Sequence, residues 1–137
     1  MPVFSWPIRV YYEDTDSGGV VYYANYLRFL ERARTEWLRS LGCEQDELRE
    51  RRGQAFVVRA LSIDYHHPAR FNDRLEIDTQ VERLRRASLE FFQQVRRAQA
   101  SGSPLCSARV RVACVDLATL RPCPLPYDLL TEIKRGS

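Results

Sequence analysis

The chain has 137 residues, 45% of them hydrophobic, which is long enough for one domain with its own core and short for two. No window approaches the roughly 18 uninterrupted apolar residues of a membrane span, and residues 1–9 lack the basic and apolar regions of a signal peptide. We therefore expect a single cytoplasmic domain over residues 1–137 with no membrane span.

The net charge is +3, and nearly all of the positive charge is arginine, since Lys134 is the only lysine. Arginine suits a phosphate-bearing ligand, and a compositional bias of the source genome explains the same excess equally well. A net charge of this size does not by itself indicate nucleic-acid binding. No Cys-x-x-Cys pair is present, so neither a zinc site nor a disulfide framework is indicated, and we expect free, mostly buried thiols at Cys43, Cys106, Cys114 and Cys123.

The first part of the chain predicts a strand and a long helix. β-Forming residues in Phe4–Tyr12 lie on both sides of Pro7, which favours a strand that starts at or beyond that proline. From Asn25 to Leu41 the apolar residues recur at spacings of three and four, the period of an amphipathic helix. Asn25 is the predicted N-cap and Gly42 the predicted C-terminal glycine of this helix.

The second part predicts a short polar segment and four strands. Residues 44–52 are closed by Gly53 and are expected to form a helical turn or a loop. Four stretches show the alternation of half-buried strands, namely Ala55–Tyr65, Leu75–Leu84, Ser88–Arg97 and Leu105–Val115. Turn residues at 85–87 and 101–104 indicate antiparallel hairpins, and Tyr127–Lys134 is expected to form a short final helix.

This order of elements leaves the long helix with an apolar stripe that a sheet must cover. A five-stranded antiparallel sheet wrapped around one long central helix meets that need and defines an α+β fold. The open edges of such a sheet favour pairing between copies of the chain. We therefore expect a homo-oligomer, either a dimer or a dimer of dimers, that is, a homotetramer.

The run from Tyr12 to Tyr26 carries the strongest chemical signal. It places Asp14 and Asp16 beside a pair of glycines, Gly18 and Gly19, and then enters the long helix. Glycine lets the backbone approach a ligand closely, and free amides at a helix start can hold an oxygen that develops negative charge. The combination indicates an acyl-transfer or hydrolysis site, although an aspartate beside glycine is also an ordinary turn residue.

An ordered motif and several later segments link the chain to a known family. The motif is Tyr12-x-Asp14-Thr15-Asp16-x-x-Gly19-x-Val21-Tyr22-Tyr23-x-x-Tyr26, and the later segments are Glu31–Glu36, Ala55–Arg59, Pro68–Arg70 with Asp73, and Val115–Asp116. In these features the chain resembles the hotdog-fold acyl-CoA thioesterases of the 4-hydroxybenzoyl-CoA thioesterase type. The closest branch is the thioesterase associated with the Tol-Pal cell-envelope system, and the resemblance covers nearly the whole chain.

The resemblance implies a role for three residues of the motif. Asp16, three residues before Gly19, is the implied catalytic carboxylate, acting either as a nucleophile or as a general base on water. The backbone N–H of Tyr23 is the implied donor to the thioester carbonyl, and Gly19 allows the close approach. Asp14 is expected to be structural. The Tol-Pal branch often carries histidine where this chain has Tyr23, so a side-chain base is absent there.

The candidate contacts for CoA phosphates are Arg85 and Arg86, with Ser88 following, in the predicted hairpin. A solvated basic turn explains the same residues equally well. His66 and His67 offer too few ligands for a metal, so neither a metal nor another cofactor is expected.

The expected function is therefore hydrolysis of an acyl-CoA thioester to a carboxylic acid and CoA, with acyl carrier protein as an alternative carrier. A different class is a non-catalytic scaffold of the cell envelope that binds acyl-CoA or acyl carrier protein. A hotdog dehydratase fits the histidine pair at 66–67 poorly, and nucleic-acid binding has the weakest support.

Overall fold

The computed structural model describes residues 2–100 and 102–136. One antiparallel sheet contains five strands in the order β1-β3-β4-β5-β2. These strands are β1 (Phe4–Arg9), β2 (Gln54–Tyr65), β3 (Arg74–Leu84), β4 (Ser88–Arg97) and β5 (Cys106–Asp116). The helices of the described residues are α1 (Asn25–Ser40), α2 (Gln45–Arg52), α3 (Tyr127–Arg135) and a short 3-10 helix, η1 (Tyr12–Asp14). The predicted sheet and long central helix are confirmed.

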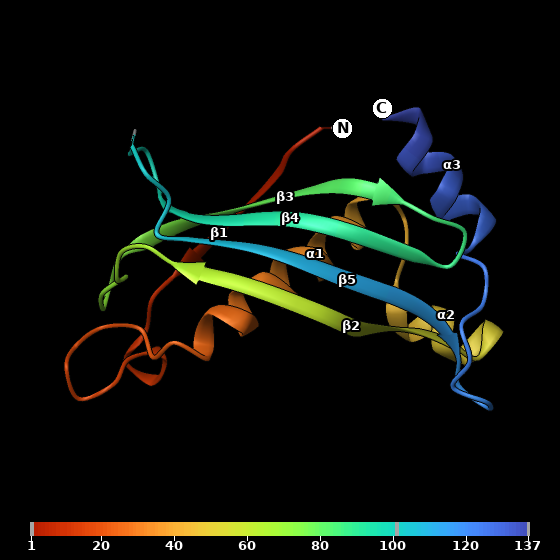
Figure 1. Ribbon diagram of the computed structural model, residues 1–137, viewed down its shortest axis with the longest axis horizontal. Helices are drawn as coiled ribbons and strands as arrows, with labels where there is room; N and C mark the ends of the chain where they lie inside the picture. Colours follow the sequence, from red (N-terminus) through yellow and green to blue (C-terminus); the bar gives the residue numbers. More distant parts are fainter. Residues whose placement is uncertain (1, 101, 137) are drawn as a thin grey trace.

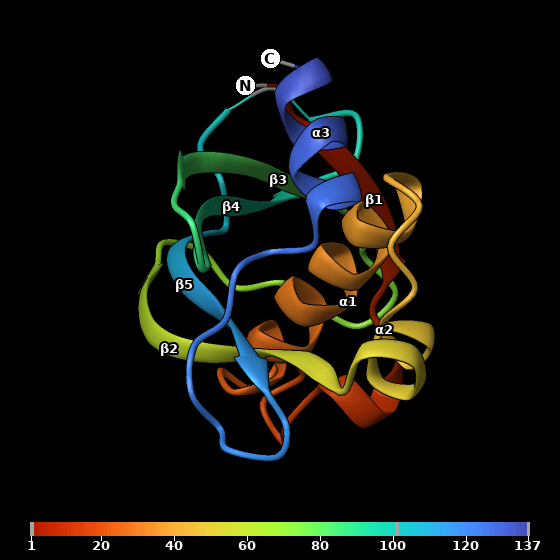
Figure 2. The same cartoon turned by 90° about the vertical axis from the view of Figure 1, so that its right-hand side faces the viewer.

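The core lies between α1 and the sheet, which curves around the helix (Figures 1 and 2). The apolar stripe of α1 is buried at Tyr26, Phe29, Leu30, Ala33, Trp37 and Leu38. Apolar residues at alternate positions of β3, β4 and β5 face this stripe, as the period of two in a strand requires. The Trp37 ring meets the Phe91 ring of β4 edge to face, with 5.1 Å between centroids.

A buried polar contact fastens the helix to the middle of the sheet. Gln93 of β4 is fully buried, and its Nε2 donates to the Leu30 carbonyl at 3.0 Å and to Thr79 Oγ1 at 2.9 Å. Arg34 Nη1 of α1 donates to Gln93 Oε1 at 3.0 Å. Because all polar atoms of the Gln93 side chain have partners, this contact fixes the position of α1 without leaving an unpaired group in the core.

The first strand differs from its predicted bounds. It begins at Phe4, before Pro7, and ends at Arg9 instead of continuing to Tyr12. Within the described residues β1 is an edge strand that pairs only with β3, so the missing N–H of Pro7 can be accommodated on the unpaired side. The chain then leaves the sheet and forms η1 at the start of the motif.

The predicted N-cap of the long helix is wrong, whereas its C-terminal end is confirmed. Asn25 is the first residue of α1 and Ala24 is the cap. The Asn25 side chain donates through Nδ2 to the Asp14 carbonyl at 2.8 Å, whereas a capping side chain accepts from the helix amides. Gly42 follows the helix with φ of +84°, the left-handed conformation that glycine provides at helix ends.

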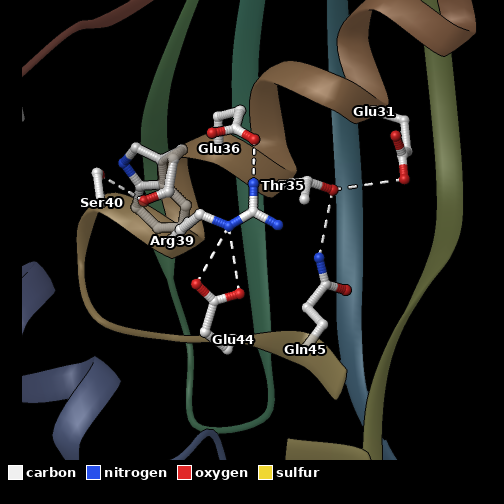
Figure 3. A network of polar contacts seen from close by, with 8 residues as sticks. Glu31, Thr35, Glu36, Arg39, Ser40, Glu44 and Gln45 are labelled. Carbon is white, nitrogen blue, oxygen red and sulfur yellow. Dashed lines mark hydrogen bonds and ion pairs between the residues drawn. The ribbon is translucent and has the colours of Figure 1, made fainter. Parts of the chain in front are cut away.

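The polar segment after α1 forms the eight-residue helix α2. Gly53 closes it with φ of +61°. Two side chains of α1 bind the residues at the start of α2 (Figure 3). Arg39 Nε lies 3.1 Å from Glu44 Oε1, and Gln45 Nε2 donates to Thr35 Oγ1 at 3.3 Å. The sequence pattern predicted either a helical turn or a loop at this place, and these contacts favour the helix.

The two ends of the described chain lie side by side (Figures 1 and 2). A Cβ atom built at Gly136, after α3, would lie 3.6 Å from Pro2 Cγ. None of the helices in the described residues is long and apolar enough to cross a membrane. The turn predicted at residues 101–104 includes Ser101, which lies outside the described residues.

Candidate active site

Residues 14–22 form a small antiparallel loop, which we call the motif loop. The Asp16 N–H donates to the Val20 carbonyl at 2.9 Å, and the Tyr22 N–H donates to the Asp14 carbonyl at 3.0 Å. The two arms of the loop are thus joined by backbone hydrogen bonds. The loop delivers the chain to the start of α1, as the sequence pattern predicted.

Asp14 holds the base of the motif loop. It is 6% exposed, and its Oδ2 accepts a hydrogen bond from the Tyr11 N–H at 2.9 Å. Its carbonyl accepts from the Tyr22 N–H and from Asn25 Nδ2. The carboxylate thus binds the residue before η1, and the backbone carbonyl joins the motif loop to α1, in agreement with the structural role expected for Asp14.

Asp16 lies at the exposed end of the motif loop. Its Oδ1 accepts a hydrogen bond from the Gly18 N–H at 2.8 Å, which orients the carboxylate. Within residues 2–100 and 102–136, no group donates to Oδ2. The arrangement therefore includes the ordinary aspartate turn and also leaves one carboxylate oxygen available to react.

Gly19 is required by the backbone of the loop. Its φ is +77°, a conformation that side-chain-bearing residues rarely adopt, and its N–H donates to the Asp16 carbonyl at 3.0 Å. A Cβ built at Gly19 would have no heavy atom of the described chain within 4 Å. The space over Gly19 is open, so the geometry of the turn is the local reason for glycine.

Tyr23 presents a free amide at the entrance to α1. Its N–H has no acceptor in the described parts of the chain, whereas its carbonyl accepts a hydrogen bond from the Tyr65 hydroxyl at 2.9 Å. The next residue, Ala24, is the helix cap. A free N–H beside the positive end of a helix dipole can hold an oxygen that carries negative charge.

Tyr65, at the end of β2, is a neighbour that sequence reasoning did not single out. Its ring lies edge to face with Tyr23 and Tyr26, at centroid distances of 6.3 and 5.4 Å. The Tyr26 hydroxyl in turn accepts from the Ala69 N–H at 3.0 Å, and the Val21 N–H donates to the Ala69 carbonyl at 2.8 Å. The only sequence signal for this contact was that Tyr65 closes a predicted strand.

Three tyrosines around the helix start have pKa values raised above the ordinary value of 10.0. The pKa of Tyr22 is raised by its hydrogen bond with the Tyr23 side chain and, in smaller part, by the negative charge of Asp16. Burial raises the pKa of Tyr26 and of Tyr65. The Tyr65 hydroxyl donates to the Tyr23 carbonyl and the Tyr26 hydroxyl accepts from the Ala69 N–H, so the raised pKa values do not indicate a phenolate base.

The predicted CoA contacts lie far from the motif loop in the same chain. Val20 pairs with Arg70, just before β3 begins, whereas Arg85 and Arg86 follow the end of β3. An eleven-residue strand separates the two places, which corresponds to about 33 Å. Figure 1 shows the motif loop and the β3–β4 turn at opposite ends of the sheet.

The cations of the β3–β4 turn differ in their partners. Arg83 and Arg85 face Glu90 of β4, with N···O distances of 3.4 and 4.0 Å. Arg86 makes no ion pair with any residue that the structure describes, although its carbonyl accepts from the Leu125 N–H at 2.9 Å. The Ser88 carbonyl accepts from the Arg85 N–H, which closes the turn. Arg86 is thus the cation most available to an anion.

The histidine pair offers no metal centre in the described residues. No three histidine, cysteine, aspartate or glutamate side chains gather there as metal ligands. His66 Nε2 instead lies 3.2 Å from Ser107 Oγ of β5.

Comparison with known proteins identifies the family. Residues 10–133 match the thioesterase-like superfamily. The chain belongs to this superfamily. It is 47% identical to the acyl-CoA thioester hydrolase YbgC of Escherichia coli O6:H1 over 97% of both chains. It is 48% identical to the acyl-CoA thioesterase YbgC of Haemophilus influenzae over 92% of this chain and 90% of that protein.

A solved structure of another thioesterase has the same fold. The crystal structure of a 1,4-dihydroxy-2-naphthoyl-CoA thioesterase from Synechocystis has a TM-score of 0.89 and 26% sequence identity, and the match covers 97% of this chain and 96% of that one. Together with the superfamily match, this likeness confirms the predicted hotdog fold and the predicted enzyme class, a thioester hydrolase. The YbgC relatives fit the Tol-Pal-associated branch that the motif indicated.

Proposed function

We propose that this member of the thioesterase-like superfamily hydrolyses acyl-CoA thioesters to a carboxylic acid and CoA, with Asp16 as the reacting carboxylate. The observation that carries the proposal is the pairing of an exposed carboxylate, one oxygen of which is free, with the free Tyr23 N–H at the entrance to α1. The acyl-CoA activity named for the YbgC relatives supports the substrate class.

Two routes use the same groups. In the first, Asp16 attacks the thioester carbon, CoA leaves as a thiolate, and water hydrolyses the resulting mixed anhydride. In the second, Asp16 accepts a proton from water as that water attacks the same carbon. In both routes the Tyr23 N–H and the positive end of α1 stabilise the negative charge that develops on the carbonyl oxygen.

The distance between the motif loop and the β3–β4 turn bears on CoA binding. One chain cannot place Arg86 on the phosphates of a substrate held by its own Asp16 if about 33 Å separate the two ends of the sheet. Among the described residues the outer edge of β2 is unpaired, and the β2 side chains Val58 and Leu61 are exposed. Antiparallel pairing of two β2 edges in a homo-oligomer would bring the turn of one copy towards the motif loop of the other.

In this arrangement the proposed contacts to the phosphates of CoA, or of an acyl carrier protein, are Arg85, Arg86 and Ser88 of a second copy. The exposure and cationic character of Arg85 and Arg86 support the assignment, since arginine binds phosphate through two parallel hydrogen bonds.

The test of the proposal is the Asp16→Asn variant. Release of CoA is followed with Ellman's reagent across acyl-CoA substrates, after protein thiols have been counted in a substrate-free sample. We expect kcat to fall by about 10²–10⁴-fold with Tm unchanged, because Asp16 is exposed and supports only its own turn. Glu13→Gln, which removes a neighbouring exposed carboxylate, is the matched control and should retain wild-type kcat.

Two results would contradict the proposal. Hydrolysis by Asp16→Asn at the wild-type rate would show that Asp16 is not the reacting group. Binding of acyl-CoA by the wild-type chain without thiol release at any chain length would favour a non-catalytic scaffold instead.

A further inference from the structure

Two cysteine side chains meet at the end of the sheet opposite the motif loop. Cys114 of β5 and Cys123 of the segment before α3 have their Sγ atoms 3.5 Å apart. We infer that these two thiols form a redox pair that closes to an intramolecular disulfide when the chain is oxidised by a peroxide. This inference does not depend on the proposed hydrolysis.

The backbone places the two cysteines directly opposite each other. Val115 and Pro122 form an antiparallel bridge, and the Cys123 N–H donates to the Cys114 carbonyl at 2.9 Å. Opposite residues at such a hydrogen-bonded position have Cα atoms about 5.5 Å apart, within the usual disulfide range of about 4.4–6.8 Å. Both side chains lie on the same face of this short ladder, so the bond can form without a change of register.

The different exposure of the two thiols determines which cysteine reacts first with peroxide. Cys114 is fully buried, whereas Cys123 is only partly buried and is open to a small oxidant. Hydrogen peroxide would convert the Cys123 thiol to a sulfenic acid, with release of one water. Cys114 sulfur would then attack the Cys123 sulfur, and the displaced hydroxide would leave as water with the Cys114 proton. Overall, the two thiols lose two electrons and the peroxide gains them.

The other cysteines are poorer partners. Cys106 lies near the opposite end of β5, about 26 Å along the strand from Cys114. Cys43 is close enough for its charge to act on Cys114, but within the described residues it has no sulfur contact of its own. Cys43 is therefore the competitor that an experiment must exclude.

A disulfide here would close a ten-residue loop and join β5 to the segment that leads into α3. The same segment supports the β3–β4 turn, since the Leu125 N–H donates to the Arg86 carbonyl. Oxidation would thus restrain the C-terminal segment beside the turn, and the oxidised chain should unfold at a higher temperature than the reduced chain.

The experiment compares the purified full chain after reduction with dithiothreitol and after treatment with hydrogen peroxide. Remaining thiols are blocked with iodoacetamide, and the chain is digested without reduction by a protease that cleaves before aspartate. Asp116 is the only aspartate between the two cysteines, so they fall in separate peptides. The Cys114 peptide also contains Cys106, which iodoacetamide blocks. We expect the two peptides to stay joined after oxidation, with a mass about 2 Da below the sum of the Cys114 peptide blocked at Cys106 alone and the unblocked Cys123 peptide, and to separate when dithiothreitol is added.

Matched variants complete the test. Cys123→Ser should yield no joined peptide and no rise in Tm on oxidation, whereas Cys43→Ser should retain both effects. Joined peptides that contain Cys43, covalent dimers as the main product, or Cys114 and Cys123 both blocked by iodoacetamide after peroxide treatment would overturn the inference.

Discussion

The two ends of the sheet present their candidate site residues in different ways. At the motif-loop end, backbone hydrogen bonds and the left-handed Gly19 position Asp16 and the Tyr23 amide. At the other end, Arg83 and Arg85 are positioned by Glu90, which reaches them through the register of β3 with β4. The first arrangement is encoded within a few consecutive residues, whereas the second depends on a neighbouring strand.

After Asp16→Asn, the largest expected effect concerns the Tyr23 N–H. Tyr23→Pro removes this donor, whose loss is expected to lower kcat by about 10²–10³-fold. The N–H makes no hydrogen bond in the described chain, and Tyr23 is the second residue of a turn closed by the Asn25 N–H and the Tyr22 carbonyl, a position that favours proline, so Tm should change little.

The matched control is Tyr23→Phe, which keeps the N–H and removes only the hydroxyl. Thiol release by both variants is compared at saturating acyl-CoA. Equal activity of Tyr23→Pro and Tyr23→Phe would assign the carbonyl contact to another group.

The next effect separates the two aspartates of the motif. Asp14→Ala leaves the partly buried Tyr11 N–H without its acceptor, so the free energy of unfolding should fall by about 0.5–1.5 kcal/mol. Denaturant unfolding measures this change, and Asp14→Asn should recover part of it because an amide oxygen can still accept the bond. An unchanged midpoint for Asp14→Ala would contradict its structural role.

A smaller effect is expected at the β3–β4 turn. Arg86 has no carboxylate partner in the described residues, so Arg86→Ala should raise KM for acyl-CoA by about 2- to 5-fold, with kcat unchanged. The increase should shrink as salt is added, because exposed charges are screened. Arg83→Ala, which removes a cation already paired with Glu90, is the control. A KM for Arg86→Ala equal to the wild-type value would remove the turn from the substrate site.

The effect that is smallest near neutral pH, and that grows only at high pH, is one that both ends share. Burial raises the pKa of Cys106 and of Cys114, near the two ends of β5, from 9.0 to about 12. The unfolded chain therefore loses these protons at lower pH than the folded chain, and stability falls as pH rises above about 9. Tm measured from about pH 8 to about pH 11 should decline, and the decline should be shallower in Cys106→Ala. A Tm independent of pH over this range would contradict the raised values.

Much of the fold could be predicted from periodicity because each element buries one regular face. The long helix and four later strands follow from spacings of three and four or of two, and Gly42 marks a real helix end. The predicted start of the first strand, at or beyond Pro7, was wrong. Proline interrupts a strand that is paired on both sides, whereas β1 is an edge strand. Sequence alone does not show which side of a strand stays unpaired.

Within the candidate site, the sequence predicted those residues whose positions are set by the local backbone. Asp16 and Gly19 lie in one hydrogen-bonded loop that leads to Tyr23, and the catalytic roles of all three residues are proposals. Asn25 was expected to cap the helix and instead donates to the Asp14 carbonyl, and Tyr65 was missed. Both contacts join segments that are distant in sequence or folded back on each other, so local patterns do not reveal them.

The adjacency of Pro2 and Gly136 has a practical consequence for protein engineering. Both ends of the described chain lie away from the motif loop (Figures 1 and 2). A short flexible linker could therefore join them in a circular permutant, with new ends opened in an exposed turn. For the same reason, a fusion partner or a surface tether attached at either end would leave Asp16 and the entrance to α1 unobstructed.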